Sequence, residues 1–194
     1  MKRFAVIPTH DRFDDFFDCL NAIAPQVDQV FMIDHNSGYG VQTEKVTLIR
    51  YDEDPPNISR MWNLGLEEAA QRTTSLDYYV AVLNDDAIVP PTWFDEVLDG
   101  MQDFGSTLGC AARGYDHRPA GYAFILAGGS GLRADEQFRW WYGDDDLHRR
   151  ALELGGVCQV PGIDVEHRYP NSTTYGILRL IAHEDEKRFK RKWE

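Results

Sequence analysis

Residues 79–90 read YVAVLNDDAIVP and are the most informative segment of the chain. Five strand-favouring residues run without a break into Asn84, Asp85 and Asp86, and a Pro-Pro pair follows at 90–91. Such an apolar run is typical of a central strand in an open α/β sheet, where ligands gather at the carboxyl ends of the strands. Adjacent carboxylates need a partner when they are buried, so the segment predicts a divalent-cation site. The alternative is a polar turn with solvated acids.

Strands and helices alternate on both sides of this segment. In the first half we expect strands at 4–7, 30–33 and 46–49, and helices at 14–25, 57–70 and 91–101. This alternation predicts an α/β fold with a mainly parallel central sheet and helices on both faces. The second half is less regular, with strands expected at 108–112, 121–127, 138–142 and 157–160 and helices at 146–154 and 175–193.

Length and composition fit a single globular domain. The chain has 194 residues, of which 43% are hydrophobic, and a formal net charge of −12. An acidic surface argues against tight nonspecific binding of nucleic acid, because phosphate contacts supply most of that affinity. The N-terminal sequence predicts neither a signal peptide nor a membrane span, so we expect a cytoplasmic protein without a transmembrane segment. The three cysteines show no paired spacing and are expected to be buried free thiols.

Polar residues form three clusters, which follow four of the expected strands. Thr9 and Asp34 end the first two, the 84–86 cluster ends the central strand, and Asp144–Asp146 follow the expected strand at 138–142. In a doubly wound sheet such ends converge on one crevice. A nucleotide-diphosphate donor could use all three clusters, with the acids holding Mg²⁺ or Mn²⁺ against its phosphates. A histidine ligand would favour Mn²⁺.

Five segments carry a resemblance to a known family. In chain order they are FAVIPT at 4–9, IDHNS at 33–37, LNDD at 83–86, WYGDDDL at 141–147 with Arg150, and His167. Together they resemble the landmarks of GT-A-fold, family-2-like glycosyltransferases. The resemblance implies one GT-A-like domain, with a Rossmann-like nucleotide-binding half at about 1–105, an irregular acceptor half at about 106–174, and a C-terminal helix at 175–194. It also implies a nucleotide-sugar donor, expected to be a UDP-sugar, a divalent metal, and transfer with inversion.

The resemblance also implies roles for individual residues. Those expected to contact the donor are Pro8, Thr9, Asp34, Arg60, Asn63, Asn84 and Asp85. Asp86 and His167 are the expected metal ligands, with Asp86 in the place of the last aspartate of a DXD-like motif. Asn84 departs from the aspartate that the family often has, and amide oxygen is a poorer metal ligand, so this position is expected to orient water or ribose.

The acidic triplet would supply the general base. An acceptor hydroxyl is a poor nucleophile until a carboxylate accepts its proton. In the motif that this segment resembles, a leucine and then an arginine follow the catalytic aspartate. Matching them to Leu147 and Arg150 implies that Asp144 is the base, whereas matching the acid pair implies Asp145, and both stay candidates. The neighbouring Trp140 and Trp141 are expected to stack on an acceptor, although alternation along a strand would turn one of them into the core.

Two other functions remain open. One is a nucleotidyltransferase that makes sugar nucleotides, although the Gly-rich basic loop expected after its first strand is replaced here by Thr9-His10-Asp11-Arg12. The other is a noncatalytic module that binds sugar nucleotides or glycans. The acceptor could be a glycan, a protein, a small molecule or a modified base. Because the chain is short, homo-oligomerisation is one way to complete the acceptor site.

Overall fold

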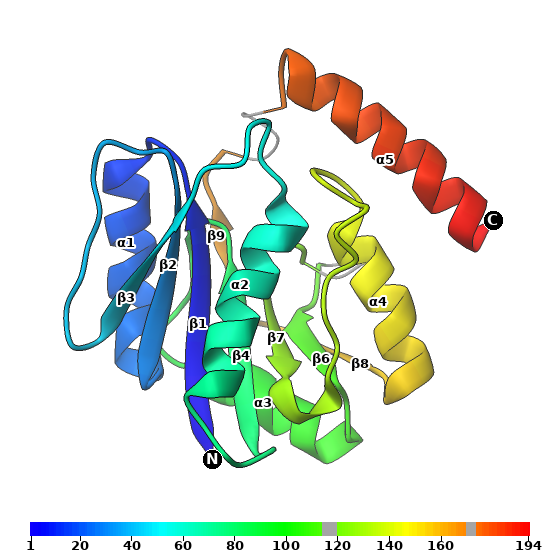
Figure 1. The fold of residues 1–194 in the computed structure, drawn as a ribbon. Coiled ribbons are helices and arrows are strands. Elements are labelled where there is room, and N and C mark those ends of the chain that lie inside the picture. The colour runs from blue at the N-terminus through cyan, green and yellow to red at the C-terminus, as the bar shows by residue number, and fades with distance from the viewer. Residues whose placement is uncertain (114–119, 170–173) are drawn as a thin grey trace.

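The computed structural model describes residues 1–113, 120–169 and 174–194, and its centre is a seven-stranded sheet in the order β3-β2-β1-β4-β7-β6-β8 (Figure 1). The strands of this sheet are β1 (Lys2–Thr9), β2 (Gln29–His35), β3 (Val46–Tyr51), β4 (Tyr78–Leu83), β6 (Leu108–Ala111), β7 (Ala123–Ala127) and β8 (Val157–Val160). Two short strands, β5 (Ala87–Ile88) and β9 (Glu166–His167), pair separately. The helices are α1 (Phe13–Ile23), α2 (Ile58–Gln71), α3 (Trp93–Phe104), α4 (Gly143–Leu154) and α5 (Ile177–Trp193), with 3₁₀ turns at Ala24–Gln26 and Gly128–Ser130.

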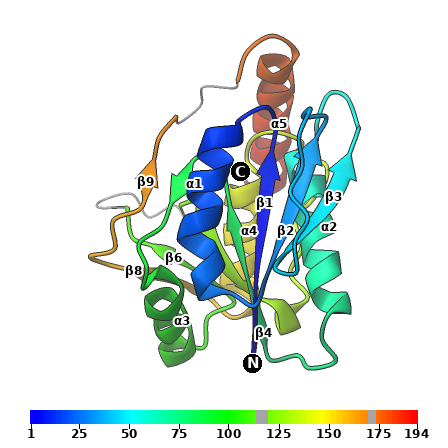
Figure 2. The ribbon, with the colours of Figure 1, turned by 90° about the vertical axis from the view of Figure 1, so that its left-hand side faces the viewer.

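The sheet has helices on both faces, as the alternation predicted. Along β1, Ala5 and Ile7 pack in the core cluster that holds α1 and α3. Phe4 and Val6 point the other way, into the cluster that holds α2 and α4. Figure 2 shows α1 and α3 on one side of the sheet and α2 on the other. This alternation of side chains explains why β1 is apolar throughout, as expected for a strand buried on both faces.

Helix α2 approaches the sheet closely because it carries a glycine at the contact. A Cβ built on Gly65 would lie 2.4 Å from the Val6 side chain, so any larger residue would push the helix away from β1. The helix begins at Asn57, whose side chain accepts a hydrogen bond from the backbone N–H of Arg60. This N-cap stabilises the start of the helix that covers one face of the sheet.

All neighbouring strand pairs in the sheet are parallel except those of β7. Strand β7 runs antiparallel to both β4 and β6, and it joins the first half of the chain to the second within one sheet. The strand expected at 138–142 is wrong: residue 138 is irregular and residues 139–142 form bends before α4. Side chains take the place of a neighbouring strand here, since Ser59 Oγ donates to the Phe138 carbonyl and Asp185 accepts from the N–H groups of Trp140 and Trp141.

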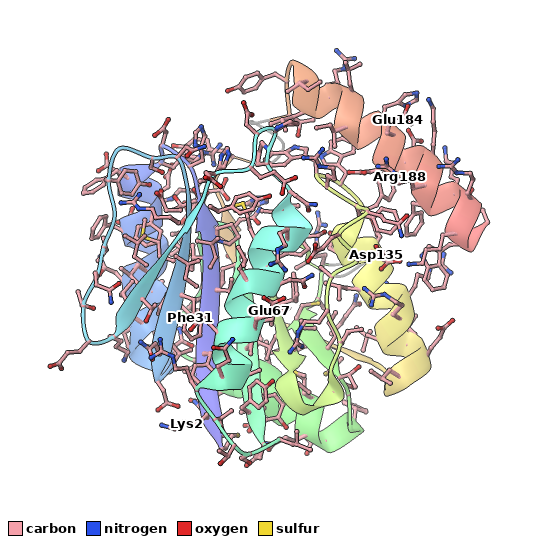
Figure 3. All side chains as sticks on the ribbon, viewed as in Figure 1. Lys2, Phe31, Glu67, Asp135, Glu184 and Arg188 are labelled. Carbon is pink, nitrogen blue, oxygen red and sulfur yellow. The ribbon has the colours of Figure 1, made fainter. Side chains whose placement is uncertain are left out.

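Helix α5 is held to the body of the protein mainly by polar contacts. Buried Asp185 accepts hydrogen bonds from the backbone N–H groups of Trp140 and Trp141, at 2.8 and 3.1 Å. It also forms an ion pair with Arg188 at 2.9 Å. Figure 3 places Glu184 and Arg188 on α5, above the segment that carries Asp135. None of the helices in the described ranges has both the length and the apolar character needed to span a membrane.

Replacing Asp185 by alanine is expected to lower the free energy of unfolding by about 1–3 kcal/mol, because two partly buried backbone N–H groups and Arg188 would lose their acceptor. Glu184→Ala is the matched control: Glu184 lies on the same helix, exposed, and pairs only with Lys187 among the described contacts. That control is expected to change stability by less than about 0.5 kcal/mol. Urea unfolding measures both, and equal losses in the two variants would contradict the assigned role of Asp185.

Candidate functional site

The candidate site lies where the order of the strands reverses. The chain passes from β1 outward to β2 and β3, and then returns to place β4 on the other side of β1. The carboxyl ends of β1 and β4 are therefore neighbours at the switch point, where open α/β sheets bind ligands. Thr9 at the end of β1 donates a hydrogen bond from Oγ1 to Asp85 Oδ2 at 3.0 Å, and the hydroxyl of Tyr39 lies 3.0 Å from the same Oγ1. Two of the expected donor-binding residues thus meet.

Asp86 is buried and surrounded by groups that donate to it. Arg12 Nη1 donates to Asp86 Oδ2 at 2.9 Å, and the backbone N–H of Tyr169 donates to the same oxygen at 3.2 Å. His167 Nε2 lies 3.4 Å from the other oxygen, Oδ1. The pairing of β5 with β9 brings His167 to this position, since Ala87 and His167 are register partners. The structure therefore joins the two residues predicted to be metal ligands.

The adjacent carboxyl groups differ in acidity. Burial raises the pKa of Asp85 to about 7, although the hydrogen bond from Thr9 and the charge of Arg12 oppose this rise. Burial also acts to raise the pKa of Asp86, but His167 and Arg12 outweigh it and hold that pKa below its ordinary value. Asp86 is thus the carboxylate that carries negative charge most readily at this site.

A divalent metal fits the chemistry of this site in part. A carboxylate and an imidazole suit Mn²⁺, and Mg²⁺ also binds through one or two carboxylates with the other ligands coming from water and phosphate. Within residues 1–113, 120–169 and 174–194, no group of three or more His, Cys, Asp or Glu side chains is arranged to hold a metal ion. Asp86 and His167 would therefore hold the metal together with donor phosphate and water.

Asp34, near the end of β2, is fully buried, and only one of its two carboxylate oxygens has a partner among the described residues. Its Oδ2 forms an ion pair with Arg50 on β3, whereas its Oδ1 has no hydrogen-bond partner among the described residues. An unpaired buried carboxylate oxygen is costly unless a ligand donates to it. This arrangement suits a hydroxyl or amide donor of a bound molecule, as predicted for ribose or base.

The remaining candidates for donor contacts are placed differently. Pro8 is buried within β1, and the backbone N–H of Asn84 donates to the Tyr122 carbonyl at 2.9 Å. Arg60 pairs with Glu67 and Glu136. Asn63 donates to the carbonyl of Ala134 at 3.0 Å and to Glu136 at 2.8 Å. Both α2 residues are thus bonded to the 134–136 segment, and their contacts with a donor stay predictions.

The three acids at the start of α4 have different surroundings. Asp146 is fully buried and bonds Arg150, Lys192 and the indole N–H of Trp193, at 2.8, 2.7 and 3.0 Å. It therefore anchors α5. Asp144 and Asp145 are partly exposed in the first turn of the helix. Of the triplet, these two are the ones open to a substrate.

The positions of Asp144 and its neighbours depend on the surrounding backbone. A Cβ built on Gly121 would lie 1.8 Å from Asp144 Oδ2, so glycine at 121 makes room for this carboxyl group. Tyr142, just before the helix, has φ = 65°, a left-handed conformation that is unusual for a bulky residue. Its ring stacks on Phe189 of α5, with centroids 5.0 Å apart. Helix α5 thus helps to fix the start of α4.

The two tryptophans predicted to bind an acceptor lie outside the core. Trp140 is partly buried, and its indole N–H donates to Thr174 Oγ1 at 3.1 Å. The Trp141 side chain is 40% exposed, which leaves its ring accessible to a ligand. Acceptor binding by either residue stays a prediction.

Sequence reasoning missed Arg12, Tyr39 and Tyr122 at this site. Arg12 bonds Asp86, Tyr39 lies at Thr9, and the Tyr122 ring stacks on His167 with centroids 4.3 Å apart. For Arg12 the sequence did contain a signal. Arg12 is a basic residue just after β1, and the end of β1 was expected to lie close to the acidic residues at 84–86. The two tyrosines have no comparable sequence signal.

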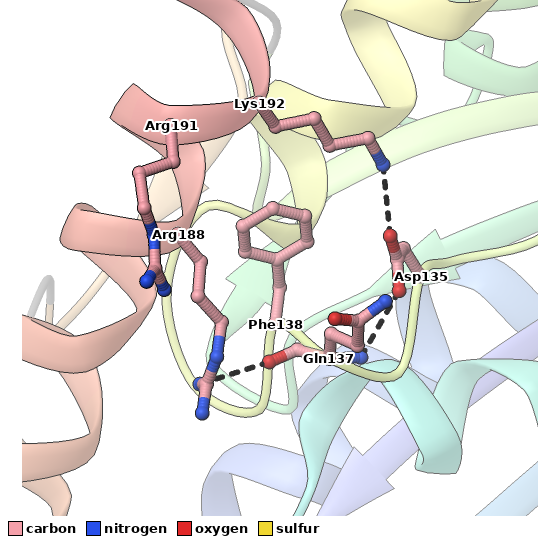
Figure 4. Close-up of a pocket in the computed structure, with 6 residues that line it drawn as sticks. All are labelled: Asp135, Gln137, Phe138, Arg188, Arg191 and Lys192. Atoms are coloured by element: carbon pink, nitrogen blue, oxygen red, sulfur yellow. Dashed lines mark hydrogen bonds and ion pairs between the residues drawn. The ribbon is translucent and has the colours of Figure 1, made fainter.

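A hollow of about 360 Å³ lies away from these residues, between α5 and the segment before α4 (Figure 4). It is lined by Asp135, Gln137, Phe138, Arg188, Arg191 and Lys192. Two of its three cations are already bonded to carboxylates: Lys192 to Asp135 and Asp146, and Arg188 to Asp185. These internal pairs favour a role in holding α5.

Comparisons with known proteins address the fold. No protein-family model matches the chain, and no curated protein matches it in sequence. Among solved structures, that of S. aureus TarS 1-349 matches with a TM-score of 0.64 and 12% identity over 95% of this chain and 65% of that one. TarS 1-349 in complex with UDP-GlcNAc matches with a TM-score of 0.60 and 12% identity, covering 95% and 66% of the two chains.

TarS 1-349 in complex with UDP matches with a TM-score of 0.59 and 11% identity over 82% of this chain and 58% of that one. The chain therefore spans less than two thirds of the length of each of these TarS chains. With so little identity, the likeness concerns the arrangement of the backbone. The sheet order, the helices on both faces and this likeness together show that the chain has a GT-A-like α/β fold.

Proposed function

We propose that this chain is a metal-dependent inverting glycosyltransferase that transfers a sugar from a nucleotide-diphosphate donor, a UDP-sugar, to an acceptor hydroxyl. The observation that carries the proposal is the meeting of Thr9, Asp85, Asp86 and His167 at the switch point of the sheet. The GT-A-like fold supports it, since TarS, with the same fold, has been crystallised with UDP and UDP-GlcNAc.

The nucleoside part of the donor would bind at the ends of β1 and β2. The unpaired Oδ1 of Asp34 would accept a hydrogen bond from a ribose hydroxyl or a base N–H. Thr9 and Asp85 would add polar contacts beside it. Burial of these groups makes their contacts with the donor selective, because a ligand that lacks the matching donors would leave them unpaired.

Asp86 and His167 would hold Mn²⁺ or Mg²⁺, and that cation would offset the negative charge that develops on the departing diphosphate. The choice between the two metals stays a prediction. Arg12, beside Asp86, adds a fixed positive charge to the same region. The site therefore contains a guanidinium as well as acids, which suits an anionic diphosphate leaving group.

Transfer would occur in one displacement. Asp144 or Asp145 accepts the proton of the acceptor hydroxyl as its oxygen bonds to the anomeric carbon, and the bond from that carbon to the diphosphate oxygen breaks. Because attack and departure take place on opposite faces, the anomeric configuration is inverted. Trp141, with its exposed ring, would provide a stacking surface for the acceptor. The acceptor's identity, a cytoplasmic location and an oligomeric state stay predictions.

Thermal unfolding with a panel of nucleoside diphosphates and their sugars, in Mn²⁺, Mg²⁺ or chelator, tests the donor site. UDP or a UDP-sugar with metal is expected to raise the midpoint, because a ligand that binds only the folded state stabilises it by mass action. The Asp34→Ala variant is expected to lose most of this rise, and Asp103→Ala, which changes an exposed acid on α3, is expected to keep it. A midpoint that no nucleotide raises would refute the proposed donor site.

A further inference from the structure

The Arg12 guanidinium lies where a cation would bind Asp86. Arg12 Nη1 is 2.9 Å from Asp86 Oδ2 and 3.8 Å from Asp85 Oδ1, so one positive group faces both carboxyl groups. The side chain of Arg12 is 20% exposed and that of Asp86 only 3%. Arginine therefore forms a largely buried ion pair with the residue predicted to be the principal metal ligand.

The residues around Asp86 and Arg12 support this arrangement. The Tyr169 backbone N–H donates to the same oxygen of Asp86, at 3.2 Å, and the guanidinium carbon of Arg12 lies 5.4 Å from the centre of the Tyr169 ring. The Arg168 backbone N–H donates to the Asp86 carbonyl at 3.2 Å. Arg168 and Tyr169, directly after β9, thus contact the ion pair, Arg168 through Asp86 and Tyr169 through both Asp86 and Arg12.

A divalent cation and Arg12 cannot both use Asp86 without a cost. A metal bound at Oδ2 would take the lone pair that accepts the hydrogen bond from Arg12, and the two positive charges would repel each other at short range. If the metal were held at Oδ1 and His167, the guanidinium would still be close enough for strong repulsion within a largely buried site. Departure of Arg12 from Asp86 relieves both costs.

We propose that Arg12 is an internal counter-ion that competes with the divalent cation for Asp86, so that the site binds metal weakly until Arg12 moves away. An anionic diphosphate offers Arg12 a new partner, and the metal and the donor would therefore bind cooperatively. This inference rests on the proposed function for the role of the donor. The competition between Arg12 and the cation rests on the contacts of Asp86 alone.

Titration of the folded protein with Mn²⁺, followed by the electron paramagnetic resonance signal of the free ion, tests the competition without nucleotide or activity. Arg12→Gln, which removes the charge, is expected to bind Mn²⁺ about tenfold or more tightly than the wild type. Arg12→Lys keeps the charge and is expected to bind close to the wild type. Asp86→Asn is expected to bind least.

Arg168→Gln is the matched control for net charge. Arg168 lies next to His167, but its side chain pairs with Asp15, Asp18 and Glu166, and it contacts Asp86 through its backbone N–H, which the substitution keeps. This control is expected to change the Mn²⁺ affinity less than about threefold, as a screened surface charge would. An equal gain in Arg168→Gln would mean that general charge, and not competition at Asp86, sets the affinity, and would overturn the proposal.

Unchanged or weaker Mn²⁺ binding by folded Arg12→Gln would also overturn it. Should Arg12→Gln fail to fold, Arg12→Met, which keeps much of the length of the side chain but removes its charge, takes its place and is expected to bind Mn²⁺ about tenfold or more tightly than the wild type. Unchanged or weaker binding by folded Arg12→Met would refute the competition. Failure of the donor site is distinguishable, because the thermal panel would show no nucleotide binding while Arg12→Gln still bound Mn²⁺ more tightly.

Discussion

Asp86→Asn is expected to reduce the rate of sugar transfer by about 10³-fold. Asn keeps the size of the side chain but removes its negative charge. In the wild type, His167 and Arg12 stabilise that charge and hold the pKa of Asp86 below its ordinary value. The variant would lose the principal ligand for the metal and leave the positive charge of Arg12 without its partner. Initial rates of UDP release from a UDP-sugar measure the effect.

The controls for this variant separate chemistry from stability. Asp103→Asn makes the same change at an exposed position of α3 and is expected to retain the wild-type rate. Circular dichroism should show the same secondary structure for both proteins. Metal-dependent transfer at the wild-type rate by folded Asp86→Asn would exclude Asp86 as the metal ligand.

Asp144→Asn is expected to slow transfer by about 10²–10⁴-fold while leaving donor binding unchanged, because a general base acts on the acceptor and not on the nucleotide. Asp145→Asn is the direct comparison, since both carboxyl groups lie in the first turn of α4 and both are partly exposed. The rate at saturating donor and the midpoint rise with UDP are measured for each variant. Equal, small losses of rate in both variants would contradict the assignment of the general base to either Asp144 or Asp145.

Gly121→Ala distinguishes the two acids by position. Its added Cβ would fall 1.8 Å from Asp144 Oδ2 and must displace that carboxyl group. If Asp144 is the base, this variant is expected to lose transfer without losing donor binding. If Asp145 is the base, the rate should be affected much less. Agreement between Gly121→Ala and Asp144→Asn would assign the role to Asp144.

Much of the first half of the fold could be predicted because its signals are local. The apolar run at 79–83 and the polar residues after it mark β4 and its carboxyl end, and the regular alternation around them implies a parallel sheet. The meeting of Thr9 with Asp85 follows from that topology, since sequential βα units bring strand ends to one edge.

The second half was harder to predict because contacts distant in sequence determine it. Nothing in the sequence near 138–142 reveals that Asp185, more than 40 residues later, accepts hydrogen bonds from the backbone N–H groups of Trp140 and Trp141. These N–H groups are therefore not available to pair with a neighbouring strand. The antiparallel direction of β7 likewise depends on its partners, β4 and β6. Local strand propensity is easily overridden by such contacts.

The same reason explains what the sequence could not reveal about the candidate site. Asp144, Asp145 and Asp146 are equivalent in sequence. In the structure, however, Asp146 forms an ion pair with Lys192 and accepts a hydrogen bond from the indole N–H of Trp193, both near the C-terminus. Arg12 follows an ordinary strand end, and only the folded structure puts its guanidinium on Asp86. The chemical type of each residue was readable, whereas its partner was not.

Hydrogen–deuterium exchange of the wild-type protein, with and without a UDP-sugar and Mn²⁺, tests the donor site most directly. Slower exchange is expected at the carboxyl ends of β1, β2 and β4, in residues 7–12, 33–37 and 84–88. Protection confined to residues 135–138 and 188–192, which line the hollow beside α5, would contradict the proposed donor site. It would place the nucleotide in that hollow instead.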